Sequence, residues 1–199
     1  MNESDLVTRC QSGDVEAFGV LVERYSDKAI RTAYLITGRK EIAEDIAQEA
    51  FIQCYYSIQQ LKNIAVFKTW FYKILMRTSW KMLARTKEQM QVDSIDREIN
   101  HNLADCFDLI ETVEIRQSYE ALYKAVGTLS KPLNEVIVLY YYNGLTIKEI
   151  AQILNCREGT VKSRLFNARK WLADGLRKKG WDVSYFEERQ LGKECHLNV

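Results

Sequence analysis

The chain has 199 residues, of which 47% are hydrophobic, and its formal net charge is only +1. One proline and nine glycines leave few turn-forming positions, which argues against a many-stranded sheet and favours long helices. The N-terminus has no apolar signal segment, and no stretch approaches the ~20 apolar residues that span a membrane. We therefore expect an all-α, cytoplasmic protein.

The near-neutral total hides an uneven distribution of charge. Lys and Arg outnumber Asp and Glu by 13 to 10 in residues 1–87 and by 12 to 5 in residues 116–180. In residues 88–115 the balance is reversed, at 1 to 8, and the last nineteen residues carry 2 against 4. This pattern predicts two small helical domains, 1–87 and 116–180, joined by an acidic linker at 88–115 and followed by a polar tail at 181–199.

Five cysteines are scattered without a CxxC pair, which is typical of reduced thiols rather than of a disulfide framework. His101 and Cys106 are too few for a structural metal site, which usually has four ligands. The sequence has no glycine-rich phosphate loop and no recognisable catalytic triad. We therefore predict no metal, no cofactor and no enzymatic activity.

Residues 14–36 have apolar side chains at helical spacing, and residues 41–58 follow with a second such pattern. The side of the second helix opposite its apolar face is acidic or amide-bearing: Glu41, Glu44, Asp45, Gln48 and Ile52 fall within roughly 100° of each other, and Glu49 flanks them. This face is either a solvated surface or a surface that docks a basic helix of a partner.

The next helix, predicted over residues 67–86, combines a basic stripe with indole rings. Its cations are four residues apart and stack along one side, with tryptophans on or beside them: Lys73, Arg77, Lys81 and Arg85, with Trp70 and Trp80. Phe71, Leu75 and Met82 define the opposite, apolar side. Cations that follow a backbone and rings on which bases stack can hold a single nucleic-acid strand. The alternative is that the aromatic rings are core and the cations are merely solvated.

A helical pattern resumes around 116–128. Ser130 is the expected N-cap of a further helix with Pro132 in its first turn, and Asn143-Gly144 ends that helix. Residues 145–172 then give two short amphipathic helices that break at Asn155-Cys156. This arrangement predicts a helix-turn-helix whose second helix enters a DNA major groove.

The second of these helices should turn Val161, Leu165 and Ala168 inward. Its outward and flanking positions carry hydroxyl, amide, aromatic and cationic groups that suit base edges and phosphates: Gly159, Ser163, Phe166, Asn167 and Lys170 outward, and Thr160, Lys162, Arg164 and Arg169 on the flanks. Gly159 leaves room for a phosphate near the helix N-terminus. The alternative is an ordinary helical hairpin with a solvated basic face.

Five stretches, in this order, resemble the extracytoplasmic-function (ECF) sigma factors of bacterial RNA polymerase: DVEAFGVLVERY, AEDIAQEAFIQCY, FKTWFYKIL, LNEVIVLYYYNGLTIKEIAQIL and REGTVKSRLFNARKWL. The resemblance covers roughly residues 10–85 and 116–178. It implies an alternative sigma factor whose first domain binds core polymerase and melts the minus-ten element. The helix-turn-helix domain would read the minus-thirty-five element, and a linker between the domains would thread into polymerase.

By position, the resemblance also implies roles for single residues. Asp45, Gln48 and Glu49, with neighbouring Glu44 and Ile52, would dock on the coiled coil of the largest polymerase subunit. Trp70, Lys73, Arg77 and Lys81, with neighbouring Trp80 and Arg85, would hold the melted strand. In the helix-turn-helix, the DNA-facing set would be Gly159, Thr160, Lys162, Ser163, Phe166 and Asn167, with Arg157, Arg164 and Arg169 near phosphates.

The sequence departs from the family at three places. Arg77 and Lys81 replace frequent Asn and Asp residues of the melting helix, Asn167 stands where many members have Arg, and Arg157 occupies a usual capping position. Promoter DNA, core polymerase and an inhibitory anti-sigma factor are the expected partners. Two other functions stay open from the residues alone: a dimeric helix-turn-helix repressor or activator, and a nucleic-acid enzyme.

Overall fold

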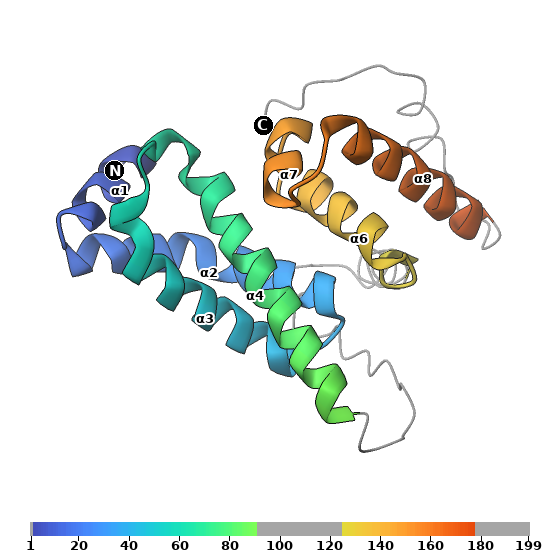
Figure 1. The fold of residues 1–199 in the computed structure, drawn as a ribbon, viewed down its shortest axis with the longest axis horizontal. Coiled ribbons are helices and arrows are strands. Elements are labelled where there is room, and N and C mark those ends of the chain that lie inside the picture. The colour runs from blue at the N-terminus through green and yellow to red at the C-terminus, as the bar shows by residue number, and fades with distance from the viewer. Residues whose placement is uncertain (1, 91–124, 178–199) are drawn as a thin grey trace, which may run out of the picture.

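The computed structural model describes residues 2–90 and 125–177, and all regular structure within these ranges is helical, with no strand. Figure 1 shows the helices in two groups, one from each end of the chain. The predicted all-α class with two helical units is therefore confirmed. Within the described ranges, no helix combines the length and the apolar character that a membrane span needs.

The first unit contains four α-helices, and its sequence shows why they start and stop where they do. Asp14 caps the second helix, because its Oδ1 accepts a hydrogen bond from the backbone N–H of Ala17 at 2.9 Å. Gly38 ends that helix in the left-handed conformation, with φ of 70°. The elements are α1 (Glu3–Gln11), α2 (Val15–Thr37), α3 (Lys40–Ser57), the 3₁₀ turns η1 (Ile58–Gln60) and η2 (Ile64–Val66), and α4 (Phe67–Met90).

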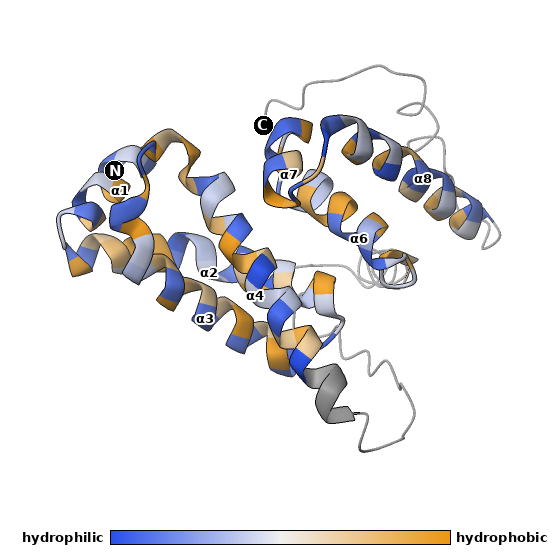
Figure 2. Ribbon diagram, viewed as in Figure 1, coloured by the Kyte–Doolittle hydropathy of each residue, from blue (hydrophilic) through white to orange (hydrophobic). Residues whose placement is uncertain are grey.

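Apolar and polar positions alternate along α2 and α3, as Figure 2 shows, and the apolar sides meet in the core of this unit. Phe71 of α4 lies at its centre, fully buried, with the rings of Tyr25 and Phe51 at 5.4 Å and 4.9 Å between centroids. Helix α1 was not predicted, although its Leu6 and Val7 are fully buried. Nine residues are too short a window for a clear helical period.

The described part of the second unit begins with helical residues 125–127 and continues through α6 (Lys131–Ile137), the π-helix η4 (Val138–Tyr142), α7 (Ile147–Ile153) and α8 (Glu158–Arg177). Ser130 is the N-cap of α6 as predicted, but its side chain makes no capping hydrogen bond. Gly144 follows η4 with φ of 63°, and Asn155 turns the chain between α7 and α8 with φ of 50°. Both breaks match the sequence prediction.

The two units pack against each other and share one continuous cluster of buried side chains. The contacts join α4 to α7, and α2 to both α6 and η4. Among the described residues, Thr69, Trp80, Asn134 and Asn143 donate side-chain hydrogen bonds across this boundary. The sequence predicted two domains but gave no indication of this contact.

Several predictions fall on residues outside the described ranges. These are most of the acidic linker at 88–115, the helical pattern at 116–124, the tail at 181–199, and the pair His101 and Cys106. Helix α4 extends to Met90 and so includes the first three residues assigned to the linker.

Candidate polymerase and nucleic-acid interfaces

The first candidate interface is the helix-turn-helix formed by α7 and α8. A reciprocal capping box starts α7: the backbone N–H of Thr146 donates to Glu149 Oε2 at 2.8 Å, and the Thr146 hydroxyl accepts from the Glu149 N–H at 3.3 Å. Burial alone would raise the pKa of Glu149, but hydrogen bonds from Thr146 and Thr69 outweigh it, so the pKa is lowered. Glu149 is therefore a charged anchor for α7.

Helix α8 buries the side that the sequence predicted. The opposite side, which carries the predicted DNA-facing residues and is called the reading side below, is exposed. Val161, Leu165 and Ala168 are at most 2% exposed. The predicted outward positions are all exposed: Gly159, Ser163, Phe166, Asn167 and Lys170, together with Lys162 and Arg157. No atom lies within 4 Å of the place that a Cβ of Gly159 would take, so a DNA backbone can approach there.

Other flanking residues of α8 are partly engaged within the unit. Arg169 Nε donates to the Tyr141 hydroxyl at 2.8 Å, and its guanidinium carbon lies 5.7 Å from the ring centroid of Tyr140. Arg164 is half-buried and favours the charged form of Glu135, while Thr160 is half-buried. The contacts with Tyr141 and Tyr140 fix where the guanidinium group of Arg169 lies beside the reading side.

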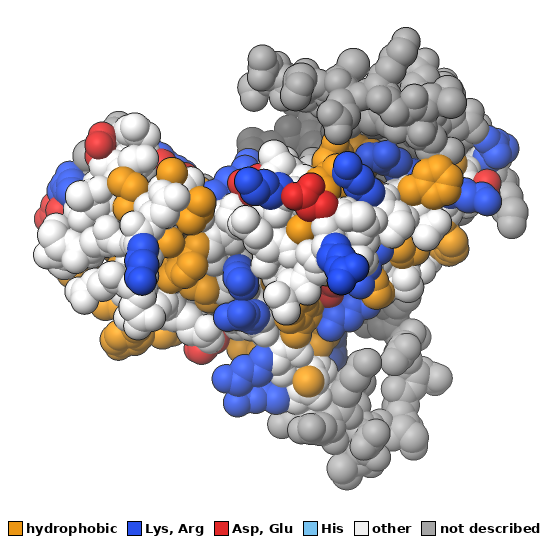
Figure 3. Space-filling view, turned by 45° about the horizontal axis from the view of Figure 1, so that its top comes forward, with side chains coloured by type: hydrophobic (Ala, Val, Ile, Leu, Met, Phe, Trp, Pro, Cys, Tyr) orange, Lys and Arg blue, Asp and Glu red, His pale blue; other side chains and the backbone are white. Residues whose placement is uncertain are grey.

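The second candidate interface is the basic side of α4. Arg77, Lys81 and Arg85 are exposed and Lys73 is half-buried, so the predicted cations do form a surface stripe. Figure 3 shows Lys and Arg side chains over both units on one face of the molecule. The opposite residues Phe71 and Leu75 are fully buried.

The two tryptophans of α4 are less available than the cations. Trp70 is half-buried, with its ring centroid 6.1 Å from that of Phe67. Trp80 is also half-buried and donates its indole N–H to Glu135 Oε1 of α6 at 2.7 Å. Lys131 Nζ lies 5.6 Å from the centroid of the same indole. Both rings were predicted to meet nucleic acid, but here Trp80 meets the second unit.

Glu135 is a functional candidate that sequence reasoning missed. It is 6% exposed, and burial raises the pKa of its carboxyl group against the opposing effects of Trp80, Lys131 and Arg164. An acidic residue among apolar neighbours in a helix (NEVIV) is the only sequence signal for it, and that signal does not identify its partner.

The third candidate interface is the acidic and amide face of α3. All its central members are exposed: Glu41, Glu44, Asp45, Gln48 and Ile52. Glu49 is half-buried at its edge and accepts a hydrogen bond from Gln53 Nε2 at 2.8 Å.

 The carboxylates are thus presented outward, as a docking surface for a basic partner requires.

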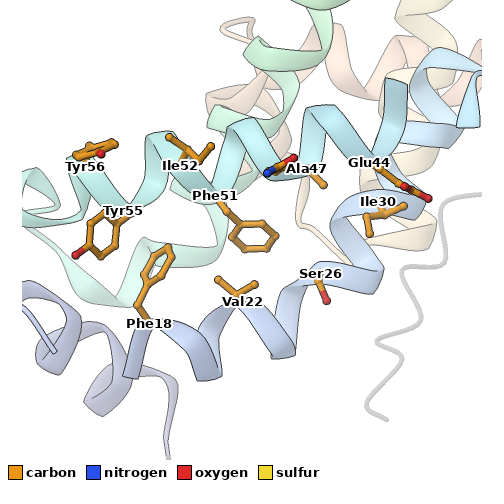
Figure 4. Close-up of a pocket in the computed structure, with 11 residues that line it drawn as sticks. Phe18, Val22, Ser26, Ile30, Glu44, Ala47, Phe51, Ile52, Tyr55 and Tyr56 are labelled. Atoms are coloured by element: carbon orange, nitrogen blue, oxygen red, sulfur yellow. The ribbon is translucent and has the colours of Figure 1, made fainter. Parts of the chain in front are cut away.

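An apolar groove runs beside this face, between α2 and α3, and the sequence prediction missed it. Figure 4 shows Phe18 and Val22 of α2 opposite Phe51 and Tyr55 of α3, with Glu44 near one end. Tyr56, at the other end, is 78% exposed. The signal was present in the sequence, because Ile52, Tyr55 and Tyr56 are apolar at helical spacing on a side of α3 that was otherwise assigned as polar.

Cysteine and acidic residues do not assemble a further site in the described part of the chain. No group of three or more His, Cys, Asp or Glu side chains is arranged there to hold a metal ion. Cys10 and Cys54 are buried free thiols, and Cys156 is a half-buried one. Burial raises the pKa of Cys54 to about 12, so this thiol packs as an apolar group.

Comparison with known protein families assigns each of the two units to a family. Residues 21–89 match the family described as Sigma-70 region 2, and residues 119–172 match Sigma-70, region 4. The ECF RNA polymerase sigma-E factor of Escherichia coli K12 is 32% identical over 181 residues, which cover 85% of this chain and 92% of that protein. The chain belongs to the ECF sigma factors. It is an alternative sigma factor that directs RNA polymerase to promoters.

Other relatives match the sequence of this ECF sigma factor along nearly the whole chain. The sigma-E factor of Haemophilus influenzae is 30% identical, and the match covers 88% of this chain and 96% of that protein. The RNA polymerase sigma-H factor of Pseudomonas aeruginosa is 31% identical, and the match covers 87% of this chain and 93% of that protein. Among solved structures, CnrH in complex with the cytosolic domain of CnrY gives a TM-score of 0.65 at 21% identity, covering 88% of this chain and 97% of that chain. The sigma factor RpoE of Bartonella quintana, in complex with the anti-sigma factor NepR, gives a TM-score of 0.63 at 20% identity. The match covers 80% of this chain and 96% of that chain.

These two structures support the helical fold. The alternative function, a dimeric repressor or activator, receives no support from any of these relatives.

Proposed function

We propose that three surfaces of this ECF sigma factor divide the work of starting transcription. The α3 face docks core polymerase, the α4 stripe holds the melted non-template strand at the minus-ten element, and the reading side of α8 recognises the minus-thirty-five element. The protein itself adds no catalytic chemistry, because polymerase makes the phosphodiester bonds. It acts in the cytoplasm, where polymerase and promoter DNA meet.

The observation that carries this proposal is the exposure of the three residue sets on separate elements. Exposed carboxylates and an amide on α3 complement a basic helix, and the apolar groove beside them offers contact area for its apolar side. The cations of α4 are spaced to follow a phosphate backbone. Hydroxyl, amide and cationic groups on α8 suit the major groove.

An inhibitory anti-sigma protein is a further proposed partner. The structurally similar RpoE was solved with its anti-sigma factor NepR, and CnrH was solved with the cytosolic domain of CnrY. A partner of this class would prevent the same surfaces from reaching polymerase or DNA.

The decisive experiment is transcription in vitro with purified core polymerase on genomic fragments, followed by mapping of start sites. The wild-type chain should give discrete starts that core polymerase alone does not give. Gln48→Lys combined with Glu49→Lys should abolish these transcripts and the co-purification with core polymerase, because the change removes most of the negative charge of the docking face and places two cations in it.

A matched control introduces the same change in charge elsewhere on the first unit. Asp5 and Gln59 are exposed and lie outside the α3 face, so Asp5→Lys combined with Gln59→Lys should transcribe like wild type. Full activity of the Gln48 and Glu49 variant would contradict the docking assignment. A stable dimer on a symmetric operator, with no polymerase binding, would contradict the proposed function as a whole.

A further inference from the structure

Two consecutive tyrosines of η4 hold the guanidinium group of Arg169. The Nε of Arg169 donates to the Tyr141 hydroxyl at 2.8 Å, and its guanidinium carbon lies 5.7 Å from the ring centroids of both Tyr140 and Tyr141. The two rings meet edge to face, with centroids 5.0 Å apart and planes at 77°. A cation near the face of an aromatic ring is attracted by the electron density of the ring. Arg169 is therefore held by a hydrogen bond and by two rings that support each other.

The backbone of η4 is shaped for this double contact. Neighbouring side chains of an α-helix point about 100° apart, so two of them seldom contact the same group. Residues Val138–Tyr142 instead form a π-helix, in which the Asn143 N–H donates to the Val138 carbonyl oxygen, five residues back, at 3.1 Å. Its wider turn takes more residues, so successive side chains point in more similar directions. Such segments are rare in proteins and often lie at functional sites, and this one carries the two tyrosines that contact Arg169.

Arg169 lies beside the reading side of α8. Phe166 and Arg169 are three residues apart, which makes them neighbours on the helix surface. Phe166 is 48% exposed, whereas Arg169 is half-buried. A guanidinium has five N–H donors in one plane, and its pair of terminal nitrogens matches two oxygens of a phosphate. The bond from Nε to Tyr141 and the two rings fix this plane, and with it the direction of the terminal nitrogens.

Restraint of this side chain in the free protein changes the free energy of DNA binding. An arginine loses rotamer freedom when an interface immobilises it, and this loss opposes binding. Here the contacts with Tyr140 and Tyr141 restrict the side chain before DNA arrives. Preorganisation of this kind strengthens binding by about two- to tenfold for one side chain.

We propose that Tyr141 is a positioning residue for promoter binding, which holds the Arg169 guanidinium toward a backbone phosphate of the minus-thirty-five element. Tyr140 provides a second ring, and the π-helix η4 brings both tyrosines to the same guanidinium. The inference rests on the proposed role of α8 at the minus-thirty-five element. Because every base sequence presents the same phosphates, the contribution of Tyr141 is equal for all promoter sequences.

The test measures the binding of the full chain, assembled with core polymerase, to a promoter fragment taken from the mapped start sites. Tyr141→Phe keeps the ring and removes the hydroxyl that accepts from Arg169. It should raise the dissociation constant about two- to tenfold, by the same factor for every base change in the upstream element. Tyr140→Phe is the matched control: it also removes one hydroxyl from η4 but keeps the bond between Tyr141 and Arg169, so it should bind like wild type.

A double-mutant cycle separates positioning from support of the fold. Arg169→Ala should weaken promoter binding and reduce the slope of log affinity against log salt concentration by about 1, as expected for one lost phosphate contact. In the Arg169→Ala chain, Tyr141→Phe should then have no further effect, because the group that it positions is absent. A hydroxyl that only supports the fold would weaken binding by the same factor in both chains.

Unchanged affinity of Tyr141→Phe would overturn the inference, and so would equal weakening in the chains with and without Arg169. Unchanged affinity and salt slope of Arg169→Ala would also overturn it, since there would be no phosphate contact to position. In all three cases the wild-type holoenzyme would still give discrete transcription starts, so the proposed function would stand. Absence of discrete starts with the wild-type chain would instead contradict the proposed function, and the inference with it.

Discussion

Single side chains of α8 differ in how they can meet DNA. Ser163 and Lys162 are exposed, and the Ser163 hydroxyl donates only to the Thr160 carbonyl of its own turn, at 3.0 Å. Arg169 is instead held by Tyr141. Hydroxyl and cationic groups that are exposed can reach base edges in the major groove, whereas we assign Arg169, at the edge of the helix beside Tyr141, to a phosphate.

Ser163→Ala or Lys162→Ala should therefore cost about 1–3 kcal/mol of promoter binding at one upstream base position. The measurement is holoenzyme binding to a promoter set in which each base of the upstream element is varied. Arg169→Ala serves as the comparison and should weaken all sequences alike. An even loss across all sequences for Ser163→Ala and Lys162→Ala would remove them from the reading set.

Glu149 gives a prediction about pH. Its pKa in the folded protein is lowered from 4.5, so its charge stabilises the fold above the unfolded pKa, and this stability is lost as pH falls through the lower folded pKa. Glu149→Gln keeps a capping side chain without the titrating group. The difference in melting temperature between wild type and this variant should stay constant from pH 7 to about pH 5.5 and shrink as the pH falls through 4.5 and below.

Glu135→Gln is the matched control, because the pKa of Glu135 is raised rather than lowered. The stability that comes from the raised pKa is present at low pH and lost as pH rises through the folded value. The variant should therefore gain relative to wild type as pH increases. If the melting-temperature differences of Glu149→Gln and Glu135→Gln from wild type changed in the same direction with pH, the opposite pKa shifts of these two residues would be contradicted.

At the scale of elements, α4 combines a buried side with a charged side. Fully buried Phe71 and Leu75 fix the helix in the first unit, while Arg77 and Lys81 point to solvent. The exposed side of α4 can therefore bind a DNA strand while its buried side keeps the same packing. The proposed docking of polymerase uses a different helix, α3.

Trp70→Ala with Lys73→Ala should slow promoter opening more than it weakens the closed promoter complex, since stacking of single bases on aromatic rings is worth about 1–3 kcal/mol per base. Permanganate reactivity of unpaired thymines measures opening, and gel shift measures the closed complex. Lys62→Ala with Lys68→Ala, on the same unit but outside the stripe, is the control. Equal losses in both assays would mean that Trp70 and Lys73 only support the fold.

Helical period predicted most elements of both units, because each helix has one apolar side and a clear start or stop. Gly144 marks an end that the sequence already indicated, whereas the caps of α2 at Asp14 and Gly38 came from the structure. The exceptions have physical reasons: α1 is only nine residues long, and the π-helix η4 has no simple sequence signature. The apolar groove escaped notice because it needs two helices to form it.

At the scale of the whole molecule, the two units share one continuous buried cluster. The cooperativity of unfolding therefore depends on the contact between α4 and α7 and on the packing of α2 against α6. An independent pair of domains would melt in two steps, whereas units joined through a core melt together.

We expect a single calorimetric transition for the full chain near neutral pH. Leu75 is fully buried, and Leu75→Ala should lower this one transition by about 5–15 °C, since such truncations cost about 2–5 kcal/mol. Lys62→Ala, at an exposed position, should leave it in place. Two peaks, with only one of them shifted, would show that the units unfold separately.

The sequence by itself determined the helices, the two units, the buried and exposed sides of α3, α4 and α8, and the family. These properties depend on residues close together in the chain, whose spacing reports one face of one helix. Only the tertiary structure decided that Trp80 meets Glu135, that Thr69 meets Glu149, and that α2 and α3 enclose a groove. Such pairs are 55 and 80 residues apart, and no local pattern of charge or hydrophobicity specifies which distant side chain completes a hydrogen bond.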